Sequence, residues 1–304
     1  MREKMSVSKE VFEKYQKAGK IAANIREKVK EIVKEEMPIL EVCEEIERRI
    51  REKGAEPAFP CNVSVNEIAA HYTSPPNDKQ RIAKNSLVKV DIGVHVDGYI
   101  ADTATTVCFN PEYENLVQAA EEALNMAVKT IQSGMFTSKL GSIIQKTIEA
   151  YGCKPISNLT GHQIGRFLIH AGKSLPNVSH ISTSRIKAGE VYAIEPFVTV
   201  AEAAGRVESG RGGTIFRLVK HKSLKNSTAK QLLNYVENRF RTLPFTERWL
   251  QNVFPQKDYK NAFQELINSK AIMVYPPFIE ASLKPVAQAE HTVLIEEKGC
   301  VVLT

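Results

Sequence analysis

Residues 86–109, SLVKVDIGVHVDGYIADTATTVCF, are the stretch on which the fold depends. Two runs rich in β-branched residues flank Asp97-Gly98, which is a strong signal for a two-residue hairpin turn. If these two residues form the loop, the numbers of paired residues sum to 195, so Asp102 faces Gly93. Asp91 then shares a strand face with Asp102 as a diagonal neighbour, roughly 7–8 Å away between backbones. Carboxylates so placed can span two metal ions about 3.5–4 Å apart, provided that no bulge breaks the parity.

Four acidic residues lie in strand-like segments that are otherwise apolar, namely Asp91, Asp102, Glu195 and Glu290. An acid in such a strand is costly unless it is paired or bound to a metal. A single one would more often face solvent, whereas four together favour a shared site. His162, in the glycine-flanked segment TGHQIG, adds an imidazole where the backbone can approach closely. Such donors suit pairs of Mn, Fe(II), Co or Zn ions better than a single thiolate-bound zinc ion.

The other histidines divide into two groups. His71 and His170 each follow a strand-like segment, at a strand end from which a side chain can reach a pocket. His95, His180 and His221 are interpreted as packed or surface residues.

The composition is that of an ordinary globular protein. The chain has 304 residues, of which 43% are hydrophobic and 25% charged, which predicts one large or two moderate domains and excludes a mostly disordered chain. No stretch approaches the ~20 apolar residues of a membrane helix, and the first residues lack the apolar core of a secretory signal. Five scattered cysteines, with no C-x-x-C pair, argue against a disulfide scaffold or a structural zinc site and favour a reducing cytoplasm.

Helical periodicity occurs in two similar pairs of segments. One pair covers about 11–32 and 38–54, and the other runs from Asn110-Pro111 to Gly134 and from a Ser138 cap to Gly152. The pairs align at an offset of 98 residues, which matches Val42 with Leu140, Ile46 with Ile144, Ile50 with Ile148, Gly54 with Gly152 and Pro57 with Pro155. We expect two related halves, each helix–helix–strand, with a pocket between them.

Residues 227–270 interrupt the strand signals with three short helical patterns, STAKQLLNYVENRF, FTERWLQNVF and DYKNAFQELINSK. The surrounding stretch, 217–260, carries ten Lys or Arg and three acids, a net +7 against +6 for the whole chain. One interpretation is a solvated helical surface. The other is a basic face for an anionic partner such as ribosomal RNA.

Taken together, these segments resemble the type II methionine aminopeptidases of the pita-bread metallopeptidase family. The matching stretches are FPCNVSVNEIAAH (59–71), VDIGVHVDGYIADTA (90–104), LTGHQIGRFLIHAG (159–172), AIEPF (193–197) and AEHTVL (289–294). The resemblance implies an α+β pita-bread fold, in which a pseudo-twofold antiparallel sheet is covered by helices. It also implies a catalytic domain of residues 1–216 and 276–304 and a helical, winged-helix-like type II insertion of residues 217–275, in the shorter form found in archaea.

The resemblance also implies a role for each site residue. Asp91 would chelate one divalent ion, Asp102 and Glu290 would bridge two, and His162 and Glu195 would complete the second; the ions would be Co, Mn, Fe(II) or Zn. Glu195 would also act as general base, His71 would assist proton transfer at the scissile amide, and His170 would hydrogen-bond the developing oxyanion. The residues that would line the methionine pocket are Phe59, Ile169, Tyr275 and Phe278.

The implied function is removal of N-terminal methionine from peptides and nascent chains whose second residue is small. The protein would act in the cytoplasm as a monomer, away from membranes, with ribosome contact through the basic insertion. A prolidase or X-Pro aminopeptidase shares the ligands but carries a large additional N-terminal domain, and only about 55 residues precede Phe59. A catalytically inactive binding protein of the same fold, regulating nucleic acid or ribosomes, would have lost ligands. The segments FPCNVS and GRGGTIF depart from the usual wording, which concerns pocket shape.

Overall fold

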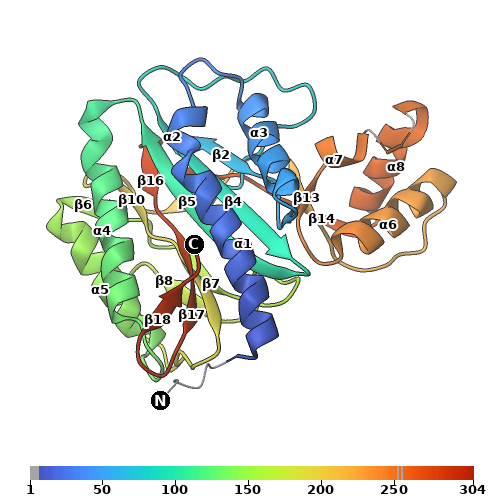
Figure 1. Ribbon diagram of the computed structural model, residues 1–304. Coiled ribbons are helices and arrows are strands. Elements are labelled where there is room, and N and C mark those ends of the chain that lie inside the picture. The colour runs from blue at the N-terminus through green and yellow to red at the C-terminus, as the bar shows by residue number, and fades with distance from the viewer. Residues whose placement is uncertain (1–6, 252, 255) are drawn as a thin grey trace.

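The structure is a computed structural model that describes residues 7–251, 253–254 and 256–304. Antiparallel strands form the middle of the molecule, and helices cover them (Figure 1). Helices α1 (Lys9–Glu27), α2 (Val29–Ile32) and α3 (Ile39–Glu52) lie over one half, and α4 (Glu114–Thr130) and α5 (Thr137–Ala150) lie over the other. A third group, α6 (Ser227–Phe240), α7 (Arg248–Gln251) and α8 (Gln256–Asn268), projects to one side.

The predicted hairpin is present with the predicted register. Strands β4 (Leu87–Val96) and β5 (Tyr99–Cys108) pair without a bulge, so Asp102 faces Gly93 and Asp91 faces Ala104. Asp97 and Gly98 have φ values of 51° and 85°, the left-handed pair that a two-residue turn of this kind requires. The expectation that Asp91 and Asp102 share one face of the hairpin is therefore confirmed.

The first half also contains β1 (Glu56–Pro57), β2 (Asn62–Val65) and β3 (Ile68–Ala70). Strands β1 and β2 both pair with β4, and α1 packs across β4 and β5. The helix predicted over 11–32 is divided at Lys28, whose N–H bonds to the carbonyl oxygen of Ile25 at 3.0 Å and tightens the turn.

The second half contains a short 3₁₀ turn (Pro111–Tyr113), β6 (Cys153–Pro155), β7 (Thr160–Ile164), β8 (Ser174–Pro176), β9 (Val191–Ile194) and β10 (Phe197–Val200). The predicted Ser138 cap is wrong, because α5 begins at Thr137 after Phe136. The backbone N–H of Thr137 bonds to the carbonyl oxygen of Ser184, and Phe136 bridges to Arg185, so a neighbouring segment determines where this helix starts. The preceding helix ends at Thr130, earlier than Gly134, since Ile131 is extended.

Residues aligned by the offset of 98 have the same structural role in the two halves. The three aligned pairs of apolar residues are all buried to within 1% exposure. Gly54 and Gly152 both follow their helices with left-handed φ values of 71° and 68°. Pro57 and Pro155 then lie in β1 and β6. Each half has its own apolar core, one centred on residues such as Ile46 and Val90 and the other on residues such as Ile144 and Ile194.

The insertion has a small sheet and an apolar cluster of its own. Strand β12 (Ile215–Leu218) pairs with β13 (Phe245–Thr246) and β14 (Ile272–Tyr275), and buried side chains such as Leu232 and Phe245 pack beneath α6 and α8. The second predicted helix is shorter than expected, because its first residues form β13. The boundaries 217–275 stay a prediction, as does the start of the catalytic domain, since residues 1–6 lie outside the described part of the chain.

The remaining strands complete the sheets by pairing with strands already described or with one another. They are β11 (Val207–Ser209), β15 (Phe278–Glu280), β16 (Val286–Gln288), β17 (His291–Ile295) and β18 (Cys300–Val302). Strand β17 pairs with β9, which pairs with β7, and Glu290 forms a bridge to Ala104 of β5. This bridge brings the two halves together at the edge where the predicted ligands lie. None of the helices in the described part of the chain combines the length and the apolar character that a membrane span requires.

Candidate metal centre

Five predicted ligands meet in one cavity of about 70 Å³. Asp91 and Asp102 come from the hairpin strands β4 and β5, and His162 comes from β7. Glu195 lies in the two-residue connection between β9 and β10, and Glu290 directly precedes β17. The ligands therefore come from neighbouring strands of both halves, and β pairing determines their relative positions.

The distances within this cluster are those of groups that can share a cation. His162 Nε2 lies 3.7 Å from Asp102 Oδ2 and 3.4 Å from Glu195 Oε1. Donor atoms of Asp102, His162 and Glu290 all lie within 4.8 Å of one another, and these three residues are 3%, 7% and 1% exposed. Water can therefore do little to stabilise their charges.

Burial dominates the electrostatics of the cluster. It raises the pKa of Asp91 to about 7, and it raises the pKa values of Asp102, Glu195 and Glu290 well above their usual range, with repulsion between the carboxylates adding to the shift. Burial also lowers the pKa of His162 to about 3, so its imidazole is neutral and has a lone pair to offer. Four crowded carboxyl groups thus create a strong demand for positive charge.

Two orphaned atoms show that the cluster fits a metal. Asp91 Oδ1 and Asp102 Oδ1 are buried and have no hydrogen-bond partner among the described residues. Such atoms are costly unless something else satisfies them. Carboxylate oxygens with one neutral imidazole are the donor set expected for Mn, Fe(II), Co or Zn. The residues present therefore fit divalent ions.

An outer layer of hydrogen bonds holds the ligands in place. Thr292 Oγ1 lies 2.7 Å from both the backbone N–H and the carbonyl oxygen of Asp102, and Thr103 Oγ1 donates to the carbonyl oxygen of Glu290 at 2.7 Å. Arg26, which reaches in from α1, contacts Thr103 Oγ1 at 2.7 Å and His291 Nδ1 at 2.8 Å. Sequence reasoning missed Arg26, although a cation next to the apolar stripe of a helix is a signal that could have found it.

His71 and His170 flank the ligand cluster. His71 follows β3 with a left-handed φ of 65°, and its ring lies between Tyr275 (5.6 Å between ring centroids) and Phe278 (4.6 Å). The ring of His170 is 4.3 Å from that of His162. Burial lowers the pKa of His71 to about 4 and also lowers that of His170, so both imidazoles are neutral near pH 7.

The predicted apolar residues divide between two cavities. Phe59, Ile169 and Tyr275 line the cavity that holds the five ligands, together with Asn62, Ala70, Ile215 and Pro244, which sequence reasoning missed. Phe278 instead lines an adjoining cavity of about 200 Å³ that shares His71, His162, His170 and Glu195. Ile215 lies in the segment GRGGTIF, whose unusual wording concerns pocket shape but does not single out this residue. Pro244 carries no local sequence signal, because only the folding of the insertion brings it to the cavity.

Comparisons with known proteins agree with this architecture. Residues 13–297 match the model of the family described as Metallopeptidase family M24. A methionine aminopeptidase of Methanothermobacter thermautotrophicus is 42% identical over 297 residues, covering 97% of this chain and 99% of that protein. One of Methanocaldococcus jannaschii is 43% identical over 295 residues, covering 97% and 99%.

Solved structures show the same fold at lower sequence identity. A thermophilic Arx1 superposes with a TM-score of 0.81 at 18% identity and covers 98% of this chain and 91% of that one. Methionine aminopeptidase from Thermotoga maritima gives 0.71 at 22% identity, with 98% coverage of both chains. Prolidase from Pyrococcus furiosus gives 0.61 at 21% identity, with 98% of this chain but 64% of that one covered. The predicted pita-bread fold is therefore confirmed.

Proposed function

The chain belongs to metallopeptidase family M24, and from this premise we propose that it removes N-terminal methionine from peptides and nascent chains whose second residue is small. One observation carries the proposal: four carboxylates, of which Asp102 and Glu290 are fully buried, share a single small cavity with a neutral imidazole and an apolar wall. The names of the archaeal relatives, at about 40% identity over nearly the full chain, support the choice of methionine.

We assign two divalent ions (Co, Mn, Fe(II) or Zn) to the cluster. Asp91 would chelate one of them and Asp102 and Glu290 would bridge both, while His162 and Glu195 would complete the other. When bound, divalent ions polarise a carbonyl group and make water more acidic at neutral pH. The demand for positive charge in the cluster and the orphaned oxygens of Asp91 and Asp102 support this assignment.

The proton transfers are assigned to the surrounding side chains. Glu195, as general base, takes a proton from the attacking water and returns it towards the leaving amine. His71, neutral near pH 7, assists that transfer at the nitrogen of the scissile amide. An N–H of the neutral His170 ring donates to the oxyanion as it develops. The proximity of His170 to His162 supports this last role.

Substrate selectivity is assigned to the shape of the two cavities. An unbranched thioether fills irregular apolar space well, and the cavity of about 70 Å³ beside Phe59, Ile169 and Tyr275 is small. We place Phe278 in the same methionine pocket on the resemblance, although the adjoining cavity is the one it lines. The rest of the peptide would occupy that adjoining cavity.

Finer aspects of the setting are also proposed. We expect the protein to act in the cytoplasm as a monomer and to reach nascent chains through ribosome contact of the insertion. A prolidase remains the competing activity, but the Pyrococcus furiosus enzyme is considerably longer than the region this chain matches.

Peptide cleavage after removal of the metal tests the proposal. Chelation should abolish release of methionine from Met-Ala peptides, and Mn, Co or Fe(II) should restore it. Asp102→Asn should lower the metal content and the activity, whereas the matched control Asp97→Asn, at the exposed turn of the same hairpin, should change neither. Full turnover in exhaustively demetallated protein would contradict the metal assignment. Cleavage of Leu- or Arg-starting peptides as fast as Met-Ala peptides would contradict the methionine pocket.

A further inference from the structure

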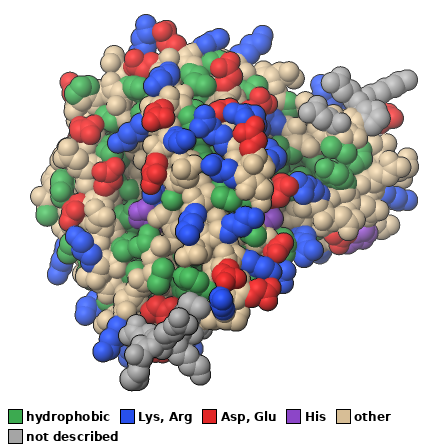
Figure 2. Space-filling view, in the orientation of Figure 1, with side chains coloured by type: hydrophobic (Ala, Val, Ile, Leu, Met, Phe, Trp, Pro, Cys, Tyr) green, Lys and Arg blue, Asp and Glu red, His purple; other side chains and the backbone are tan. Residues whose placement is uncertain are grey.

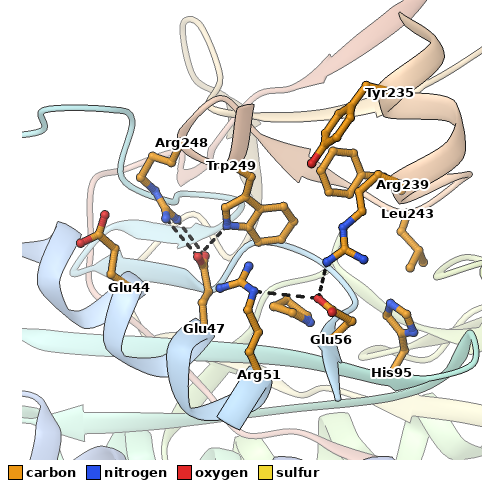
Figure 3. Close-up of a pocket in the computed structure, with 12 residues that line it drawn as sticks. Glu44, Glu47, Arg51, Glu56, His95, Tyr235, Arg239, Leu243, Arg248 and Trp249 are labelled. Carbon is orange, nitrogen blue, oxygen red and sulfur yellow. Dashed lines mark hydrogen bonds and ion pairs between the residues drawn. The ribbon is translucent and has the colours of Figure 1, made fainter. Parts of the chain in front are cut away.

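A buried carboxylate outside the metal centre joins the insertion to the first half of the molecule. Glu47 lies on α3 and is 2% exposed, and it faces Arg248 and Trp249 of α7 (Figure 3). Arg248 Nη1 donates to Glu47 Oε2 at 3.0 Å and Nη2 donates to Oε1 at 2.8 Å. Trp249 Nε1 donates to Glu47 Oε2 at 2.6 Å. We call these three residues the α3–α7 clamp.

The same carboxylate also holds one wall of the cavity of about 70 Å³ that contains the five predicted ligands, which we call the methionine-side cavity. Glu47 Oε1 accepts a hydrogen bond from the backbone N–H of Cys61 at 3.2 Å. Cys61 lies between Phe59 and Asn62, which both line the cavity. A displacement of Glu47 would therefore release the backbone from which these two side chains project.

The opposite wall of the cavity is formed by Pro244, Ile215 and Tyr275, and the clamp residues of α7 come shortly after Pro244 in the chain. Pro244 lines the cavity and directly precedes β13, in which Thr246 pairs with Ile215. Ile215 in turn pairs with Tyr275, and both of these residues line the cavity. Helix α7 begins with Arg248, two residues after Thr246, so the clamp holds the end of the strand that supports this wall.

Arg248 extends the connection to a third segment. Its Nε donates to the carbonyl oxygen of Ser74 at 2.7 Å, and Nη2 also contacts Thr73 Oγ1 at 3.1 Å. Thr73 lies two residues after His71. Arg248, one partner of the buried ion pair, thus connects the insertion with the segment that follows His71, the residue proposed for proton transfer.

Few other polar contacts can replace the clamp at this place. A cavity of about 330 Å³ lies beside the clamp, and residues of α6, β1 and α3 line it (Figure 3). Arg239 crosses that gap to Glu56 at 2.7 Å, but both side chains are nearly half exposed, and such pairs contribute little. Breaking a buried pair by removing one partner is far more disruptive, because it leaves an unpaired buried charge.

We propose that Glu47 is a positioning residue that sets the width of the methionine-side cavity, because its single carboxylate holds both walls of that cavity. The inference rests on the proposed function for its kinetic readout, but the connection between the walls can be measured without any activity. Glu47→Gln keeps the shape of the side chain and removes the charge that Arg248, Trp249 and Cys61 share. Both walls should then loosen together.

Hydrogen–deuterium exchange of the metal-loaded protein tests the connection directly. Glu47→Gln should increase exchange in the peptides covering 57–65 and 243–251 together. The matched control Glu45→Gln should not, because the ion pairs of Glu45 among the described residues are with Arg48 and Arg49 of its own helix. If Glu47→Gln fails to fold, Trp249→Phe removes the hydrogen bond to Glu47 and keeps a smaller aromatic ring, and it should show a smaller change in the same two regions.

Kinetics then test the consequence for selectivity. The ratio of kcat/KM for a Met-Ala peptide to that for a Leu-Ala peptide should fall by about tenfold or more in Glu47→Gln, at unchanged metal content. The parent enzyme's cleavage of Met-Ala peptides tests the proposed function separately. Unchanged exchange in both regions, or an unchanged selectivity ratio in a folded variant whose exchange has risen, would overturn the positioning role.

Discussion

His71 combines a strained backbone with an uncharged ring. Its φ of 65° is uncommon for a residue other than glycine and persists only where neighbours hold it, here Tyr275 and Phe278. Burial lowers its pKa to about 4, and the charge of His170 adds to the shift. Nδ1 is buried and has no partner among the residues that the structure describes. Nδ1 is therefore free to exchange a proton with a bound substrate.

We expect His71→Ala to lower kcat by about 10²–10⁴-fold, because a positioned acid–base group typically contributes that much. Metal content, measured by elemental analysis, should stay normal, since none of the five assigned ligands is changed. The matched control is His180→Ala, which removes an exposed imidazole and should leave kcat unchanged. Near-normal turnover by His71→Ala would show that His71 has no catalytic part.

How much the sequence could reveal differed from residue to residue. The relation between Asp91 and Asp102 followed from a two-residue turn and strand alternation, so local rules sufficed. Phe278 was assigned by resemblance, and it packs against the His71 ring and lines the adjoining cavity. The contribution of Pro244 depends on contacts between distant segments, which no local pattern encodes. Arg26 stands out locally as a cation beside an apolar helix stripe, but its contact with Thr103 depends on the fold.

Among the elements, the insertion shows how charge counted along a chain differs from charge on a surface. Arg248 is buried against Glu47, Arg239 pairs with Glu56, and Arg217 contacts Met273 Sδ at 3.2 Å. On the face in Figure 2, basic and acidic side chains are interspersed over the body of the molecule. The basic character left to the insertion therefore rests mainly on lysines, of which Lys225 and Lys230 are exposed and Lys222 is partly so.

Replacement of Lys222, Lys225 and Lys230 by Glu should weaken co-sedimentation with ribosomes at low salt and spare peptide cleavage. Contacts with phosphates release counterions, so binding by the parent should also fall as salt is raised. The matched control replaces Lys17, Lys20 and Lys28, three exposed lysines of α1 and its end, and should have a smaller effect. No co-sedimentation of the parent protein at low salt would remove the proposal of ribosome contact.

Across the whole molecule, the metal centre joins the two halves. Asp91 and Asp102 belong to the first half, whereas His162 and Glu195 belong to the second and Glu290 to a later strand region. Burial raises the pKa of Glu290 well above its usual value, and the charge of Asp102 adds to the shift. In metal-free protein such a group contributes stability at low pH, and that contribution is lost as the pH rises through the folded-state pKa.

Metal-free Glu290→Gln should therefore melt at a higher temperature than the metal-free parent at about pH 8, and the difference should shrink towards pH 5. Addition of Mn²⁺ should reverse the order, because only the parent keeps all its ligands and gains the full stabilisation by binding. Thermal melts with and without metal measure both effects, with the exposed Glu297→Gln as control. A lower melting temperature for the metal-free variant at pH 8 would contradict the electrostatic account.

The clamp also contains an intrinsic fluorescent probe, the indole of Trp249. Trp249 is the single tryptophan of the chain, and its indole lies between the Glu47 carboxylate and the Arg51 guanidinium, whose central carbon is 5.4 Å from the ring centroid. Indole emission excited selectively over tyrosine therefore comes from one place, the contact between α7 and α3. Its intensity and wavelength report whether that contact is closed or open without any dye. Stopped-flow fluorescence could then show whether this contact changes while methionine is released.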